Sequence, residues 1–124
     1  MQEFSLLKVN NQRLLMRLNG QDCAVKLYQR GPRMFLDLEM DGEPLRDGAL
    51  CLPCVNIIGD CKPFVGAIYC IDATADDDSR QEPPDYHGLG ERWRFFYLTP
   101  EEHEEVLAGV ASVVEGLAND TSSS

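Results

Sequence analysis

Apolar and polar residues alternate along the first part of the chain, as they do in strands that bury one face. The alternation runs over residues 13–18, 23–28 and 34–41. An Asn-Gly pair at 19–20 separates the first two segments, and this pair readily adopts the positive φ angles of a two-residue hairpin turn. A Gly-Pro pair at 31–32 separates the second segment from the third. The pattern therefore predicts a meander of three antiparallel strands.

Three later segments are also apolar enough to form strands, namely residues 49–55, 65–71 and 92–98. Segment 72–85 has no apolar periodicity and many acidic, Ser and Pro residues, so we expect an exposed acidic loop. Strands joined by short turns bury their apolar faces by folding the sheet over or closing it. The prediction is a mainly β domain over residues 1–98: a small antiparallel β-sandwich or partly closed barrel of about six strands, with a C-terminal α-helix.

The start of that helix is marked by Thr99, Pro100 and Glu102. Threonine at the N-cap and glutamate three residues later form a capping box, and proline is favoured at the first helical position. We expect an amphipathic helix over residues 99–118 and a disordered tail over 119–124. The apolar stripe of the helix consists of Val106, Val110, Val113, Val114 and Leu117.

The chain has 21 acidic and 11 basic residues, which gives a net charge of −10. This charge disfavours nucleic acid as a partner, because binding to its backbone depends on cations that displace condensed counterions. No segment approaches the roughly 18 consecutive apolar residues that span a bilayer. The first residues also lack the basic and apolar regions of a secretory signal. We therefore expect the chain to fold in the cytoplasm and not to insert into a membrane.

Four of the five cysteines are candidate metal ligands: Cys51, Cys54, Cys61 and Cys70. Four thiolates can bind zinc, but a zinc ribbon presents two close pairs, and only the first two of these cysteines are close. A thioredoxin-like site needs a helix after its CxxC step, and none is indicated here. We predict reduced, buried or half-buried thiols, with no metal and no cofactor. A small metal- or redox-responsive binding module built on these four cysteines is the alternative.

Catalytic candidates are few. Nucleophilic catalysis by Ser or Cys needs an adjacent base, and the two histidines, His87 and His103, stand in no recognisable motif. Gly88 and Gly90 precede a predicted strand, whereas phosphate-binding loops open a helix. We predict a turn there and no enzymatic activity.

The segment 92–98 has two faces. Trp93, Phe95 and Tyr97 alternate with the remaining residues and supply apolar area to a small core. The second face needs a cover, which would be the C-terminal helix or a neighbouring protein. The residues for which we predict partner contacts are Arg92, Arg94, Phe96, Leu98, Val106, Val110, Val113 and Leu117.

Several short motifs follow one another between residues 6 and 98. They are Asn11-Gln12, Leu18-Asn19-Gly20-Gln21, Met34-Phe35-Leu36-Asp37-Leu38, Asp41-Gly42-Glu43-Pro44-Leu45 with Gly48, Gly66-Ala67-Ile68-Tyr69, Tyr86-His87-Gly88-Leu89-Gly90-Glu91-Arg92-Trp93 and Phe96-Tyr97-Leu98. In this order and spacing the chain resembles the phage baseplate plug family, small proteins of contractile-tailed bacteriophages.

The resemblance implies a mainly β structural subunit of the virion, at the centre of the tail baseplate. Its partners would be the tail tube, the hub or spike, and copies of itself in a ring, and it would assemble in the cytoplasm of the host bacterium. The resemblance carries over no catalytic residue, and a hydrolase acting on cell-wall material, as some baseplate proteins are, is a second alternative. The interfaces of ring subunits would also account for an aromatic strand with a second apolar face.

Overall fold

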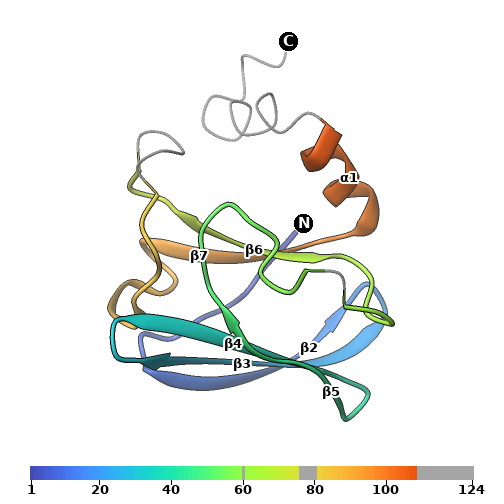
Figure 1. Cartoon of the computed structure of the whole chain (residues 1–124), viewed down its shortest axis with the longest axis horizontal. Coiled ribbons are helices and arrows are strands. Elements are labelled where there is room, and N and C mark those ends of the chain that lie inside the picture. The colour runs from blue at the N-terminus through green and yellow to red at the C-terminus, as the bar shows by residue number, and fades with distance from the viewer. Residues whose placement is uncertain (60, 76–80, 109–124) are drawn as a thin grey trace.

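The computed structural model describes residues 1–59, 61–75 and 81–108, and in these residues the protein is mainly β (Figure 1). Two antiparallel sheets lie one above the other, and neither closes into a barrel. The elements are β1 (Gln2–Glu3), β2 (Asn11–Leu18), β3 (Gln21–Arg30), β4 (Arg33–Met40), β5 (Glu43–Leu50), β6 (Ala67–Asp72), the 3-10 turn η2 (Tyr86–Gly88), β7 (Trp93–Leu98) and α1 (Pro100–Ala108). The predicted fold class is confirmed, in its sandwich form.

The four-stranded sheet has the order β2-β3-β4-β5, so each strand pairs with the next one along the chain. Asn19 and Gly20 have φ angles of 52° and 77°, and Asp41 and Gly42 have 53° and 81°. Two successive positive φ angles match the twist of antiparallel strands and close a tight hairpin. The predicted meander is confirmed, and it is extended by β5.

The three-stranded sheet has the order β1-β7-β6 and joins distant parts of the chain. Tyr97 in β7 lies between Gln2 of β1 and Ile68 of β6. β1 was not predicted, because two residues are too short for any periodicity to be visible. The strands predicted at 65–71 and 92–98 are present as β6 and β7.

The strand predicted at 49–55 is wrong in position. The structure places β5 at Glu43–Leu50, and beyond it only an isolated bridge joins Pro53 to Cys70. The register of β5 shifts twice against β4, and Gly48 has a φ of +66°, so its side chains do not alternate regularly. Irregular pairing of this kind hides a strand from sequence periodicity.

One apolar core fills the space between the two sheets. Leu18, Val25, Leu27, Leu36 and Leu38 contribute from the four-stranded sheet and are completely buried. From the other sheet the main contributors are Ile68, Cys70, Trp93, Phe95 and Tyr97. Cys23 is 5% exposed and belongs to this core, as predicted.

Helix α1 begins as the sequence predicts. The backbone N–H of Thr99 donates to the Glu102 carboxylate at 2.9 Å, and the Glu102 N–H donates to the Thr99 hydroxyl at 3.3 Å. Helix positions beyond Ala108 and the predicted tail at 119–124 lie outside the described residues. Among the described residues, no helix has the length and apolar character needed to cross a bilayer.

Candidate interaction surfaces

The aromatic strand β7 turns one face into the core. Trp93 is 7% exposed, Phe95 is completely buried, and Tyr97 packs edge-on against Phe64 with ring centroids 5.7 Å apart. The Tyr97 hydroxyl donates to the Val65 carbonyl at 2.6 Å, so its polar end is satisfied. The predicted buried face of this strand is confirmed.

The second face of β7 is covered in part by α1. Tyr69, which is opposite Phe96 in the sheet, contacts His103 of the helix, with 3.2 Å between the Tyr69 hydroxyl and the His103 Nε2. Phe96 stays half-buried, while Leu98 is 6% exposed and offers little surface to a partner. Val106 is half-buried on α1. The other three predicted contact positions of the helix, Val110, Val113 and Leu117, lie outside the described residues.

Both arginines of this face are paired within the chain. Arg94 donates to the two carboxylate oxygens of Glu3 at 2.8 and 2.6 Å, which ties β1 to β7. Arg92 donates from Nε and Nη2 to the two carboxylate oxygens of Asp72, each at 3.0 Å, and also to Glu82. Arg92 and Arg94, for which we predict partner contacts, thus already form ion pairs inside the molecule.

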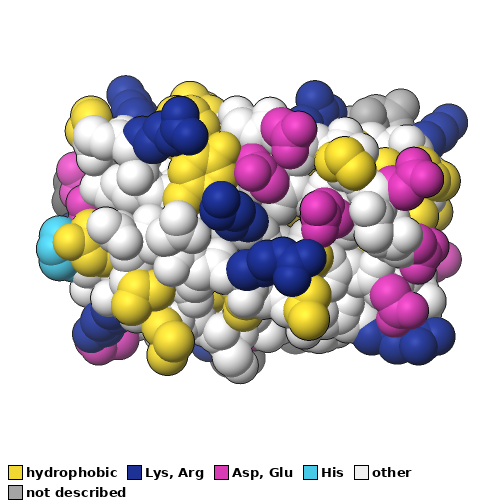
Figure 2. Space-filling view, turned by 90° about the horizontal axis from the view of Figure 1, so that it is seen from below, with side chains coloured by type: hydrophobic (Ala, Val, Ile, Leu, Met, Phe, Trp, Pro, Cys, Tyr) yellow, Lys and Arg dark blue, Asp and Glu magenta, His cyan; other side chains and the backbone are white. Residues whose placement is uncertain are grey.

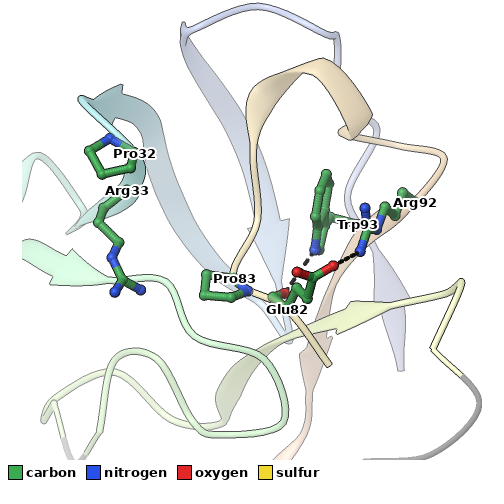
Figure 3. A pocket seen from close by; sticks show the side chains of 6 residues that line it. All are labelled: Pro32, Arg33, Glu82, Pro83, Arg92 and Trp93. Carbon is green, nitrogen blue, oxygen red and sulfur yellow. Dashed lines mark hydrogen bonds and ion pairs between the residues drawn. The ribbon is translucent and has the colours of Figure 1, made fainter. Parts of the chain in front are cut away.

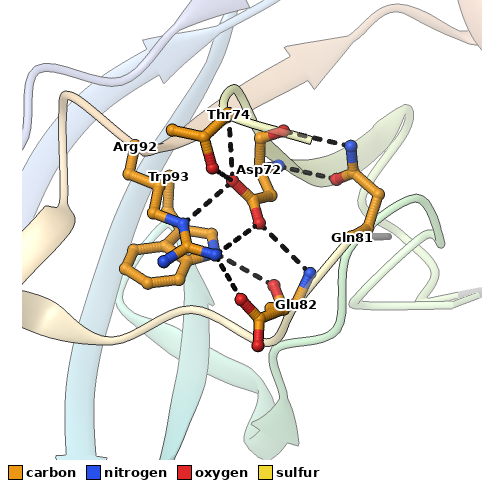
Figure 4. A network of polar contacts seen from close by, with 6 residues as sticks. All are labelled: Asp72, Thr74, Gln81, Glu82, Arg92 and Trp93. Carbon is orange, nitrogen blue, oxygen red and sulfur yellow. Dashed lines mark hydrogen bonds and ion pairs between the residues drawn. The ribbon is translucent and has the colours of Figure 1, made fainter. Parts of the chain in front are cut away.

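Asp72 organises a polar network at the end of β6 (Figure 4). Besides the two bonds from Arg92, its completely buried carboxylate accepts bonds from the Thr74 N–H and hydroxyl and from the Glu82 N–H. The Gln81 side chain bonds the Asp72 backbone in both directions. The Arg92 guanidinium, assisted by these donors, holds the pKa of the Asp72 carboxyl well below its usual range.

The network corrects the prediction of an exposed loop over 72–85. Asp72 ends β6 and is 1% exposed, and Pro84 is buried as well. Residues 73–75 and 81–83 are at the surface or partly exposed, as expected. The acidic run Asp76-Asp77-Asp78 lies outside the described residues. The sequence signal that was missed is the Asp-x-Thr step at 72–74, because Asp side chains commonly bond the backbone two residues ahead.

A shallow pocket of about 310 Å³ opens beside this network (Figure 3). The Trp93 indole N–H donates to the Glu82 carbonyl at 2.9 Å and fixes one wall. The lining residues are Pro32, Arg33, Glu82, Pro83, Arg92 and Trp93. This lining provides cations, a carboxylate and apolar walls, but no Ser, Cys or His for nucleophilic catalysis.

The cysteines of the 51–70 region do not form a ligand cluster. Cys51, Cys61 and Cys70 are buried and Cys54 is exposed. Burial raises the pKa of Cys51 to about 12 and, with the nearby Cys51 and Cys54, also raises that of Cys70. A thiol with a raised pKa is rarely ionised near neutral pH, and the thiolate is the form that reacts. Within the described part of the chain, no three His, Cys, Asp or Glu side chains are grouped so as to hold a metal ion.

The two histidines have structural partners. The His87 ring stacks on Tyr86 and its Nδ1 lies 2.5 Å from an Asp85 oxygen. His103 contacts Tyr69, as described above. These contacts join η2 and α1 to their surroundings, and in neither case is the partner a Ser or Cys.

Sequence reasoning missed the solvent side of the four-stranded sheet, which we call the outer sheet face (Figure 2). Its centre is the stacked pair Tyr28 and Phe35, with ring centroids 5.9 Å apart. Leu15 is 74% exposed and Leu50 is 39% exposed on the same side. The outward positions of β2, β3 and β4 also carry the basic residues Arg13, Arg17, Lys26, Arg30 and Arg33 and the acidic residues Asp22, Asp37 and Glu39. Figure 2 shows both kinds of charge on this face, in dark blue and magenta. The signal was present in the alternation, whose outward positions are not uniformly polar.

A family model described as "Cyanophage baseplate Pam3 plug gp18" matches residues 1–101 of the chain. The chain belongs to this family. The match spans β1 to β7, both sheets and the first residues of α1. A search of curated proteins found no significant match.

Membership confirms the resemblance found in the sequence. The chain is a structural protein of the phage tail baseplate, it belongs to the virion, and its partners are other phage tail proteins. The surfaces described above are therefore candidates for contacts within a tail, and their polar groups are candidates for holding the subunit rigid.

Proposed function

We propose that the protein is a non-enzymatic subunit placed where the tail tube meets the hub or spike, and that it acts there through protein interfaces as a plug. The observation that carries this proposal is the family match over the whole two-sheet domain. Copies of the chain would form a ring around the tail axis, built in the host cytoplasm before the particle is released. The chain would contribute shape and rigidity to that junction.

The polar groups of the domain support a mechanical role. The buried Asp72 carboxylate uses its hydrogen bonds to fix the chain on both sides of the 76–80 segment, and Arg94 fastens β1. A buried charge that is fully hydrogen-bonded favours one conformation over alternatives that leave it unpaired. A subunit that closes the tail tube and withstands mechanical force benefits from such a fixed geometry.

The cysteine-based and hydrolytic alternatives have no comparable support. Among the described residues no three His, Cys, Asp or Glu side chains are grouped to hold a metal ion, and the shallow pocket is lined by one carboxylate, Glu82, and by no Ser, Cys or His. Zinc analysis of the purified protein, and incubation with cell-wall material, would each give a signal only under these alternatives.

A nonsense mutation early in the gene tests the proposal. Grown in a host that does not suppress the mutation, the phage should give particles or tails without a complete baseplate, and infectivity should fall by several orders of magnitude. Supplying the wild-type chain from a plasmid should restore both. Complete, infectious particles in the absence of the chain would refute the proposed function.

A further inference from the structure

The charge of the chain is unevenly distributed. Residues 11–50, which form the four-stranded sheet, contain six basic and six acidic residues, whereas residues 51–124 contain four basic and 14 acidic residues. The net charge of −10 therefore arises entirely outside the four-stranded sheet. The four-stranded sheet is thus neutral overall, and any attraction between copies depends on which of its charges are unpaired at the surface.

Three cations of the outer sheet face are available for such an attraction. Arg13 pairs with Glu39 and Arg17 with Asp22. Within the described ranges, Lys26, Arg30 and Arg33 take part in no ion pair, and all three are exposed. They flank the Tyr28 and Phe35 rings, which make an apolar centre.

The aromatic centre and the cations are in direct contact. The Lys26 ammonium and the Arg30 guanidinium each lie 5.4 Å from the centroid of the Tyr28 ring. Tyrosine and arginine around an apolar centre are the residues that dominate binding energy in protein interfaces. This composition suits an acidic protein surface that also offers an apolar side chain.

Helix α1 provides an acidic surface with an exposed apolar side chain. It contains four glutamates and no Lys or Arg, and Leu107 is 63% exposed. Glu102 is used in the capping box, but Glu101, Glu104 and Glu105 are exposed and form no ion pair with any described residue. Their i, i+3, i+4 spacing places these three carboxylates on one side of the helix.

We propose that the outer sheet face of one copy binds the acidic helix α1 of a second copy, head to tail. Face-to-face pairing of two outer sheet faces would bring the unpaired cations Lys26, Arg30 and Arg33 of the two copies together, which disfavours a symmetric dimer. The outer sheet face and α1 lie on opposite sides of the molecule (Figure 1), so each copy can bind two neighbours. Unlike surfaces joined in this way give rings or stacks. The inference rests on the proposed function only in that copies must meet in the baseplate.

Sedimentation velocity of the purified full chain tests the proposal. The contact is small, so we expect a dissociation constant of roughly 10⁻⁴ M at low salt. The average sedimentation coefficient should rise with protein concentration up to about 1 mM, and raising the salt to about 0.3 M should weaken association at least tenfold, because exposed charges are screened. A wild-type chain that stays monomeric at low salt and about 1 mM would overturn the inference.

Charge reversals locate the two surfaces. Lys26→Glu and Glu104→Lys should each weaken self-association at least tenfold. The matched controls Lys62→Glu and Glu43→Lys make the same charge changes at exposed positions outside both surfaces. They should leave the dissociation constant of self-association within twofold of the wild-type value. Unchanged association of Lys26→Glu would contradict the inference.

Mixing the two defective variants tests the head-to-tail arrangement. The Lys26→Glu chain keeps an intact α1, and the Glu104→Lys chain keeps an intact outer sheet face, so the mixture should form a dimer with roughly the wild-type affinity, although each variant alone associates weakly. No dimer in the mixture would rule out this arrangement. Such a failure would leave the proposed function standing if the chain is still required for the baseplate, since the nonsense mutant tests that separately.

Discussion

The two sheets of the molecule are built by different means. In the four-stranded sheet, neighbours in space are neighbours in sequence, and tight turns such as Asn19-Gly20 set the register. In the three-stranded sheet, β1 and β7 come from opposite ends of the described chain, and the paired side chains Glu3–Arg94 and Asp72–Arg92 hold the parts together. Local turn chemistry specifies the first sheet, whereas long-range packing and buried polar contacts specify the second.

The largest difference in stability is expected between alanine substitutions at two glycines, one beside each sheet. Gly66 precedes β6 with a φ of +111°, and a Cβ there would lie 2.4 Å from the Tyr97 ring and 2.5 Å from the Leu98 carbonyl oxygen. Gly66→Ala should lower the free energy of unfolding by about 4 kcal/mol, since backbone strain and overpacking each cost about 1–3 kcal/mol.

The matched change in the four-stranded sheet is Gly20→Ala. Gly20 has a φ of +77°, but a Cβ there meets no atom within 4 Å. We expect a loss of about 1 kcal/mol, from backbone strain alone. Urea unfolding of both variants measures the difference, and equal losses would contradict the contrast between the two sheets.

The next prediction compares two arginines of β7. Arg92→Met leaves the buried Asp72 carboxylate without its cation and should cost about 3 kcal/mol. Arg94→Met breaks the exposed pair with Glu3, in which the side chains are 45% and 36% exposed, and should cost about 1 kcal/mol or less. Urea unfolding at pH 7 compares the two variants. Similar losses would mean that Asp72 does not hold the second sheet together.

Lowering the pH should weaken the network of polar contacts around Asp72. The pKa of Asp72 is lowered in the folded state, chiefly by the Arg92 side chain, from a usual value of 3.8. Its contribution to stability is therefore full above about pH 4 and is lost as the pH falls further, at about 1 kcal/mol per pH unit. The stability difference between wild type and Asp72→Asn, followed by urea unfolding from pH 6 to pH 3, should shrink below pH 4. A constant difference would show that the carboxylate charge does not matter.

The smallest effect on stability is expected at Thr99, which caps α1 directly after β7. Thr99→Ala removes the hydroxyl that caps the helix and should cost about 1 kcal/mol, while Thr99→Ser keeps the hydroxyl and should cost less than half of that. Thermal unfolding of the two variants measures the effect. Equal stability of Ala and Ser variants would mean that the cap contributes nothing to docking of the helix.

The same contrast explains what could be predicted from the sequence. The hairpin at Asn19-Gly20 and the capping box at Thr99 are local, so a few adjacent residues reveal them. β1 and the burial of Asp72 depend on partners far along the chain, Tyr97 and Arg92. Irregular pairing at Gly48 displaced the strand predicted at 49–55.

Predicting the site was harder still. The aromatic strand was assigned correctly to the core, but its arginines form ion pairs inside the chain, which no spacing rule indicates. The alternation shows that some outward positions are apolar, but the register is needed to bring Tyr28 opposite Phe35 and Arg30 opposite Arg33 on the outer sheet face. Surfaces of this kind are products of strand pairing, whereas catalytic motifs are often visible in the sequence alone.

Cross-linking mass spectrometry on intact, purified phage particles tests the central claim most directly. The chain has three lysines, Lys8, Lys26 and Lys62, and all are exposed. If the chain is a structural subunit of the baseplate, these lysines should cross-link to tube, hub or spike proteins, and the chain should be present at a fixed ratio to them. Absence of the chain from complete, infectious particles would contradict the account.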